Sequence, residues 1–186
     1  MFTRIEFRSR QLRRLAFYIK PDIDFGIVLA ALEDVSCIGD ESAMVHIRFA
    51  LLELVNNSLR AHRSESVEDP IFLEFQIIQN QSDIGDAKQI GLRIVLEDHG
   101  RGFDPSDLPY NLFGPVDTVD LQSDSFQLYR EMHNQQRFGM GLFITKRTFD
   151  SFRLEFIDFN ENTTPYNPGK IRGTRISLIH WGGNHE

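Results

Sequence analysis

The stretch from Met44 to His62 constrains the fold of this chain more than any other segment. Its apolar residues recur at steps of three and four, the repeat of one helix face: Ile47, Leu51, Leu54, Val55 and Leu59. Glu53 and Asn57 lie four residues apart, so their side chains stack one turn above the other. They are either two solvated residues of the polar face or a pair aimed into a site. In a site, Glu53 could accept a proton, and Asn57 could offer a neutral oxygen to Mg2+.

The composition indicates an ordinary globular protein and excludes several classes of function. With 186 residues, the chain is expected to form one domain, residues 1–186. A net charge of -7 argues against sequence-independent binding of nucleic acid and against an anionic membrane surface. No run reaches the ~18–20 apolar residues of a membrane span, and no signal peptide is evident, so we expect a cytoplasmic protein. Cys37 is the single cysteine, which excludes an internal disulfide.

The remaining patterns predict an α+β fold: a two-layer sandwich in which a mixed, mostly antiparallel sheet carries helices on one face. The prolines and glycines between Gly100 and Phe138 interrupt every period, and so long a connection is usually a functional lid. The central helix is expected to run from an N-cap at Asp40 to about Ala61. The other predicted helices cover residues 10–20, 24–35, 125–133 and 141–150, and the predicted strands cover residues 2–9, 71–79, 90–97, 151–159 and 171–179.

The first of three glycine motifs is Asp98-His99-Gly100-Arg101-Gly102-Phe103, directly after a predicted strand. Its glycines allow the backbone to approach a ligand closely. The Asp98 carboxylate is placed to accept a hydrogen bond from an exocyclic amine. The same pattern also occurs as an ordinary turn.

The second motif, Arg137-Phe138-Gly139-Met140-Gly141-Leu142, opens a predicted helix. Amide donors at a helix N-terminus suit phosphate, and Arg137 adds a charge that could reach a terminal phosphate. A glycine pair at a helix entry is also a frequent packing device. The third motif, Gly173-Thr174, lies inside the last predicted strand, where a glycine can simply mark a bulge.

The order of these motifs resembles the GHKL ATPase superfamily, which includes gyrase, heat-shock chaperone ATPases, histidine kinases and mismatch-repair ATPases. The resemblance covers roughly residues 40–180. No Walker Gly-x-x-x-x-Gly-Lys-Ser/Thr occurs, and a lid rather than a helix follows the first motif, unlike a Rossmann fingerprint. The resemblance implies the Bergerat ATP-binding fold, with ATP and Mg2+ as cofactors and residues 101–138 as the approximate ATP lid.

The resemblance also implies roles for single residues. It assigns Asn57 to Mg2+ and Glu53 to the general base, and it places Arg60 where it could touch phosphate through the metal site. The phosphates would be approached by the second motif through Gly139, Met140, Gly141 and Leu142. The adenine side of the site would be formed by Asp98, which binds the amine, by Gly100 and Gly102 at the base pocket and lid hinge, and by Thr174.

Within the superfamily, the segment 139–150 resembles the anti-sigma-factor serine kinases, and Arg137 matches an arginine that those kinases direct at the γ-phosphate. This implies a serine/threonine kinase that acts by phosphorylation and partner switching. Its partner would be an anti-anti-sigma-type domain, a sigma factor or both, and a homodimer is possible. Three alternatives stay open: a stand-alone histidine-kinase catalytic domain, a nucleotide-dependent binding module without significant turnover, and plain ATP hydrolysis.

Overall fold

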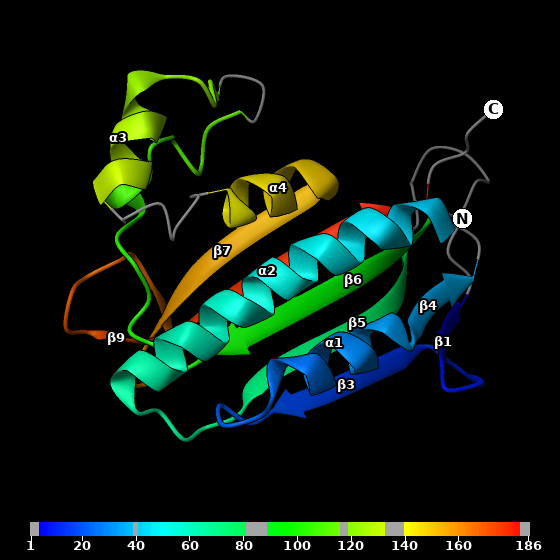
Figure 1. The fold of residues 1–186 in the computed structure, drawn as a ribbon. Helices are drawn as coiled ribbons and strands as arrows, with labels where there is room; N and C mark the ends of the chain where they lie inside the picture. Colours follow the sequence, from blue (N-terminus) through cyan, green and yellow to red (C-terminus); the bar gives the residue numbers. More distant parts are fainter. Residues whose placement is uncertain (1–3, 39–40, 81–88, 116–118, 133–139, 183–186) are drawn as a thin grey trace.

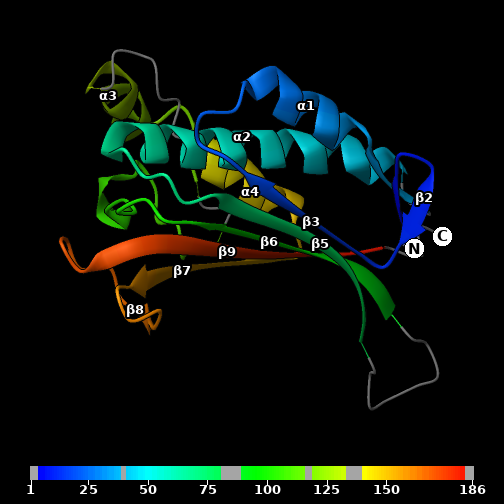
Figure 2. The same cartoon turned by 90° about the horizontal axis from the view of Figure 1, so that it is seen from below.

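The chain forms two layers, with helices covering one face of a sheet (Figure 1 and Figure 2). The structure, a computed structural model, describes residues 4–38, 41–80, 89–115, 119–132 and 140–182. α2 runs along the middle of the sheet, between α1 and α4 (Figure 1). This arrangement confirms the predicted α+β sandwich. The helices are α1 (Phe25–Glu33), α2 (Glu41–Glu65), α3 (Asp124–Met132) and α4 (Gly141–Thr148), with a short 3-10 helix at Pro105–Asp107.

The main sheet has the strand order β3-β5-β6-β9-β7-β8, and each of these neighbouring pairs is antiparallel. β9 comes last in the sequence but lies in the interior of the sheet, between β6 and β7. A second, three-stranded sheet has the order β2-β1-β4 and is also antiparallel. The strands are β1 (Arg4–Phe7), β2 (Arg10–Leu12), β3 (Arg14–Ile19), β4 (Val35–Ile38), β5 (Ile71–Asn80), β6 (Gln89–Asp98), β7 (Ser151–Asp158), β8 (Thr163–Thr164) and β9 (Ile171–Trp181).

The hydrophobic core lies between α2 and the main sheet. The whole predicted apolar stripe of α2 is at most 2% exposed, and it packs against buried residues of β5, β6 and β9. Burying each such side chain stabilises the fold by about 1.5–3 kcal/mol, so the stripe fixes the rotation of the helix about its axis. The polar side chains between the apolar ones are thereby given fixed directions as well.

The segment from Arg10 to Lys20 corrects one prediction, because it forms β2 and β3 instead of a helix. Leu15, Phe17 and Ile19 of β3 are the more buried members of an alternating pattern, which is the period of a strand. β3 pairs along its whole length with β5, and Phe17 lies opposite Leu73. Pairing with a partner more than fifty residues away therefore overrides the helical tendency of this segment.

Two further strands lie where the sequence predicts none, namely β4 directly after α1 and β8 between the predicted strands 151–159 and 171–179. The other predicted helices and strands are confirmed, with their ends displaced by a few residues. Asp24 caps α1 by accepting the Gly26 N–H at 2.7 Å. The expected cap of α2 at Asp40 lies outside the described residues.

Two further features concern membrane-spanning helices and the single cysteine. Among the described helices, none is both long and apolar enough to cross a membrane. Cys37 is buried in β4, and this burial raises the pKa of its thiol to about 12, so the thiol stays protonated near neutral pH. The assignment of residues 1–186 to a single domain stays a prediction.

Candidate functional site

Four residues from neighbouring strands form a row across one face of the main sheet. Asp98 of β6 lies opposite Thr174 of β9, Thr174 opposite Phe156 of β7, and Phe156 opposite Thr164 of β8. Residues directly opposite each other in antiparallel strands point to the same face. Ser58 of α2 contacts Asp98, so this row lies on the face that the helices cover. We call these four strand residues the Asp98 row.

Asp98 is a buried carboxylate held by three hydrogen bonds. Its Oδ2 accepts the hydroxyl of Ser58 at 2.9 Å and that of Thr174 at 2.7 Å, and its Oδ1 accepts the Gly100 N–H at 3.0 Å. The residue is only 6% exposed. An ionised carboxylate offers about four acceptor positions. One position therefore remains for an outside donor such as an exocyclic amine.

Ser58 and His62 of α2, which hold the turn after β6, were not among the predicted site residues. Both are buried on α2, and His62 accepts the backbone N–H of His99 through Nε2 at 2.8 Å. The signal that could have found them is their position. Each continues the apolar stripe, at a four-residue step from Leu54 and then from Ser58, and a polar side chain on such a stripe needs a partner.

The first glycine motif begins at Asp98, turns close beneath α2 and then approaches Phe156 of the Asp98 row. A Cβ atom at Gly100 would lie 2.9 Å from the Cβ of Ala61 on α2. Gly102 has φ +71°, a conformation that glycine adopts without steric cost, and a Cβ there would lie 3.2 Å from the Phe156 ring. Phe103 packs edge-on against the same ring, with centroids 6.0 Å apart. The two glycines thus allow the chain to leave β6 under α2 and to reach Phe156 of β7, two strands away in the sheet.

The beginning of α4 lies against the polar side of α2. A Cβ atom at Gly141 would lie 3.2 Å from Oε2 of Glu53 and 3.4 Å from Nδ2 of Asn57. Glu53 is half-buried, whereas Asn57 and Arg60 are exposed. The structure therefore brings the predicted carboxylate and amide together with the second glycine motif, although Gly141 follows Asn57 by 84 positions in the sequence.

The second glycine motif is described from Met140 onward. Met140 is the N-cap residue of α4, and its side chain makes no capping hydrogen bond. The first amide groups of a helix have no partner within the helix, so this end of α4 offers donors that suit an anion. Leu142 is half-buried against the core and contributes one of these first amide groups of α4. Arg137 and Gly139 lie outside the described residues, so their assigned roles stay predictions.

The predicted lid is attached to α4 by a lysine. Nζ of Lys146 donates to the carbonyl oxygen of Leu112 at 2.6 Å and also to that of Gly114. Hydrogen bonds from a charged group are worth roughly 1.5–3 kcal/mol when they are well formed. This pair holds the middle of the lid against the helix that follows the second glycine motif.

An aromatic cluster makes a second contact between the lid and α4. The Tyr110 ring packs edge-on against Phe143 of α4, with centroids 5.9 Å apart, and it stacks on Phe126 of α3 at 5.6 Å. Burial raises the pKa of Tyr110 above its usual value, so the phenol stays neutral at physiological pH. The lid therefore reaches α4 through both polar and aromatic contacts.

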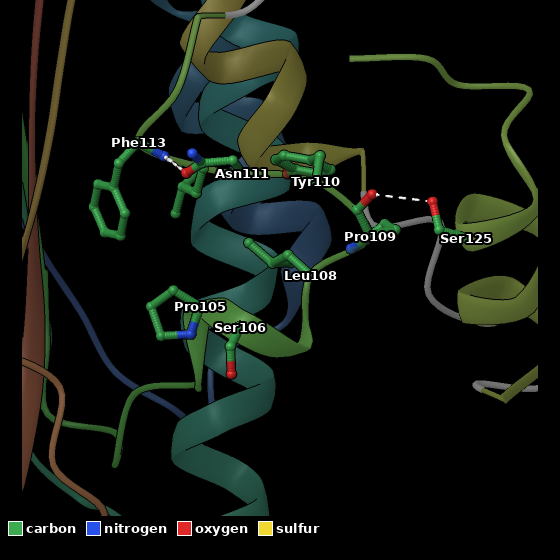
Figure 3. Close-up of a pocket in the computed structure, with 9 residues that line it drawn as sticks. Pro105, Ser106, Leu108, Pro109, Tyr110, Asn111, Phe113 and Ser125 are labelled. Atoms are coloured by element: carbon green, nitrogen blue, oxygen red, sulfur yellow. Dashed lines mark hydrogen bonds between the residues drawn. The ribbon is translucent and has the colours of Figure 1, made fainter. Parts of the chain in front are cut away.

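Two hollows lie along the lid. The first, of about 540 Å³, is open to the surface and is lined by the lid itself (Figure 3). The second, of about 480 Å³, lies where the start of the lid meets β7 and β8, and it borders the Asp98 row at Phe156 and Thr164. Ligand sites usually measure about 300–1,000 Å³, so either has room for a small molecule. The first is lined by Pro105, Ser106, Leu108, Pro109, Tyr110, Asn111, Leu112, Phe113 and Ser125.

The donor atoms at this site suit Mg2+ held together with a nucleotide. Within the described ranges, no three His, Cys, Asp or Glu side chains are close enough to hold a metal ion by themselves. Mg2+ commonly keeps several waters and takes one or two protein oxygens together with substrate phosphates. The exposed amide of Asn57 can supply such an oxygen beside the N-terminus of α4. The residues therefore fit this ion and its phosphate ligands.

The two-layer fold brings the Asp98 row and the glycine motifs together beside α2. A comparison with protein families matches residues 26–164 to the histidine kinase-like ATPase domain. This match covers most of the chain, and the chain belongs to this family. A comparison with curated proteins gave no significant match.

Proposed function

We propose that this protein is an ATP- and Mg2+-dependent kinase of the anti-sigma-factor type, which phosphorylates a serine or threonine of a protein partner. One observation carries the proposal: Glu53 and Asn57 lie beside Gly141 at the beginning of α4. A proton acceptor and a metal-binding amide therefore adjoin a helix end that suits phosphate. The family supports ATP as the nucleotide, and the resemblance of residues 139–150 to anti-sigma kinases supports the branch.

Each residue of the site then has a defined task. Asp98 orients the base through its remaining acceptor position, while Ser58 and Thr174 hold its carboxylate in place. Mg2+, bound through the amide oxygen of Asn57, would neutralise charge on the phosphates. The Glu53 carboxylate accepts the proton of the partner hydroxyl as that oxygen attacks.

The partner proposed from the resemblance is an anti-anti-sigma-type domain, a sigma factor or both, bound by a cytoplasmic homodimer. The lid exposes large apolar side chains, and two of them lie one turn apart on α3. Adjoining exposed apolar side chains mark interaction surfaces, which supports a protein partner. Since the lid is attached to α4 through Lys146, a change at the N-terminus of α4 would reach this surface. The exposed residues are Phe113, Leu121, Leu128 and Met132.

Replacing Asn57 by alanine is expected to remove the Mg2+-dependent part of ATP binding. Calorimetry with and without Mg2+ should show the wild type binding ATP more tightly with the ion, whereas Asn57→Ala should show roughly the same affinity under both conditions. Asn56→Ala is the matched control, because it removes the same side chain one position earlier on α2. Equal Mg2+ dependence in both variants would contradict the role of Asn57.

Replacing Glu53 by glutamine is expected to leave ATP binding nearly unchanged and to lower phosphoryl transfer by roughly 10²–10⁴-fold, the usual contribution of a general base. The assay follows labelled phosphate from ATP to a protein that carries an anti-anti-sigma-type domain. Acid-stable phosphoserine or phosphothreonine supports the kinase. Acid-labile phosphate on the partner would instead indicate a histidine-kinase domain. Free phosphate without a labelled protein would indicate plain hydrolysis, and ATP binding without turnover would indicate an interaction module.

A further inference from the structure

The turn after β6 is held by two side chains that lie one turn apart on α2. Ser58 holds it through the Asp98 carboxylate, and His62 holds it through the backbone of His99. His62 has no exposed surface, and its Nε2 accepts the His99 N–H at 2.8 Å. Since His99 lies between Asp98 and Gly100, this bond fixes the backbone of the first glycine motif itself.

His62 can accept this hydrogen bond only while its imidazole ring is neutral. With Nε2 acting as an acceptor, the single proton of the neutral imidazole resides on Nδ1. Nδ1 is buried, and the backbone of Asp69 acts as a hydrogen-bond acceptor toward the ring. A proton taken from water onto Nε2 would turn that nitrogen into a donor facing the His99 N–H, and two facing donors cannot bond.

We propose that His62 is a positioning residue, which holds the first glycine motif in its ligand-binding form while its ring is neutral and releases it when the ring is protonated. The inference rests on the proposed function, in which Asp98 orients the base of ATP. It adds a dependence on acidity: protonation of His62 displaces the turn, and nucleotide affinity falls.

The charged groups around His62 set the pH range in which its ring takes up a proton. Burial lowers the pKa of His62 below its usual 6.5; the Asp98 and Asp69 carboxylates oppose this change, and His99 adds to it. On the neighbouring elements, Glu65 of α2 is paired with Arg101 of the glycine motif, and Arg172 of β9 is paired with Asp69. A cationic ring would also attract Asp98, in competition with the three hydrogen bonds that hold this carboxylate.

The sign of the effect on stability follows from the same shift. Between the usual pKa of 6.5 and the lower folded value, the unfolded chain binds a proton that the folded chain does not. The contribution of His62 to stability is therefore complete above pH 6.5 and is lost as the pH falls toward the folded value. Binding of nucleotide and stability should both weaken in acid.

The test measures ATP affinity between about pH 8 and pH 5 in wild type and His62→Gln, together with thermal unfolding at each pH. Glutamine restores an acceptor oxygen but does not titrate in this range. We expect similar affinities at pH 8. Once the pH falls below the lowered pKa of His62, the wild-type affinity should be roughly tenfold below that of His62→Gln, the usual cost of one such hydrogen bond. Protonation of ATP itself affects both measurements equally, so it cancels in the ratio of the wild-type affinity to the His62→Gln affinity.

Two further variants make the result specific. His46→Gln changes an exposed histidine of the same helix and should keep the wild-type pH profile. His99→Gln removes the neighbouring ring but retains the backbone N–H, so it should also keep the acid loss. Parallel profiles of wild type and His62→Gln, with nucleotide bound, would overturn this inference alone. Absence of ATP binding by the wild type at every pH would overturn the proposed function and this inference together.

Discussion

Gly173→Ala is expected to lower the free energy of unfolding by about 3 kcal/mol, because the added methyl group has no space. Its Cβ would lie 2.1 Å from the carbonyl oxygen of Asp98 and 3.2 Å from the Cα of His99. Both are backbone atoms, which cannot rotate away as a flexible side chain can. In a chain of this size, such a loss corresponds to a fall in melting temperature of roughly 6–12 °C.

Gly169→Ala is the matched control for this prediction. Gly169 has φ +80°, and among the described residues no heavy atom beyond its chain neighbours would lie within 4 Å of an added Cβ. Alanine there therefore suffers backbone strain but no collision, and that strain costs about 1–2 kcal/mol. Urea unfolding of both variants should show the larger loss for Gly173→Ala. Equal losses would mean that β6 and β9 can separate locally to admit a methyl group.

Asp98→Ala is expected to weaken ATP binding by roughly 10- to 100-fold, since a hydrogen bond to a charged acceptor contributes about 1.5–3 kcal/mol. The wild type should prefer ATP to inosine triphosphate, which carries an oxygen in place of the exocyclic amine. Asp98→Ala should bind the two nucleotides with similar, low affinity. Calorimetry with both nucleotides measures this difference directly.

Comparison of the two nucleotides also separates reading of the base from damage to the fold. Asp98→Ala leaves the buried Gly100 N–H without its acceptor, so some loss of stability is expected. Such a loss lowers the affinity for both nucleotides alike and cannot remove a preference between them. A variant that still prefers ATP by the wild-type factor would show that another group reads the amine.

The features that sequence predicts best here are local or strongly periodic. The stripe of α2 repeats over five buried residues, and so both the helix and its core-facing side could be predicted. The glycine motifs are contiguous in the sequence. Their glycines indicate which backbone conformations are possible there. They do not indicate which distant residues the motifs contact.

Contacts between distant segments could not be predicted in the same way. Leu15, Phe17 and Ile19 have the period of a strand, but pairing with β5 decides the structure of a segment that is ambiguous by itself. The sequence shows Ser58 and His62 as isolated polar residues on an apolar face. Their roles depend on the turn after β6, whose position is set by packing over the whole sheet.

Gly173 illustrates how the importance of a motif can differ between sequence and structure. In the sequence it belongs to the weakest of the three glycine motifs, a single glycine within a predicted strand. In the structure, an added Cβ at this position would collide with the Asp98 backbone. The space beside a glycine depends on how the neighbouring strand packs in the sheet, so it cannot be predicted from the local sequence.

The place of β9 in the sheet has a consequence for the order of events during protein synthesis. β9 follows β6 and β7 in the sequence but separates them in space, and it brings Thr174 to Asp98, which lies 76 positions earlier in the chain. A nascent chain on the ribosome that has not yet released Ile171–Trp181 therefore has two strands with unpaired inner edges and an incomplete set of partners for Asp98. Translation must pass β9 before Asp98 has all of its partners, so any nucleotide that binds at Asp98 and assists folding acts after synthesis of this strand.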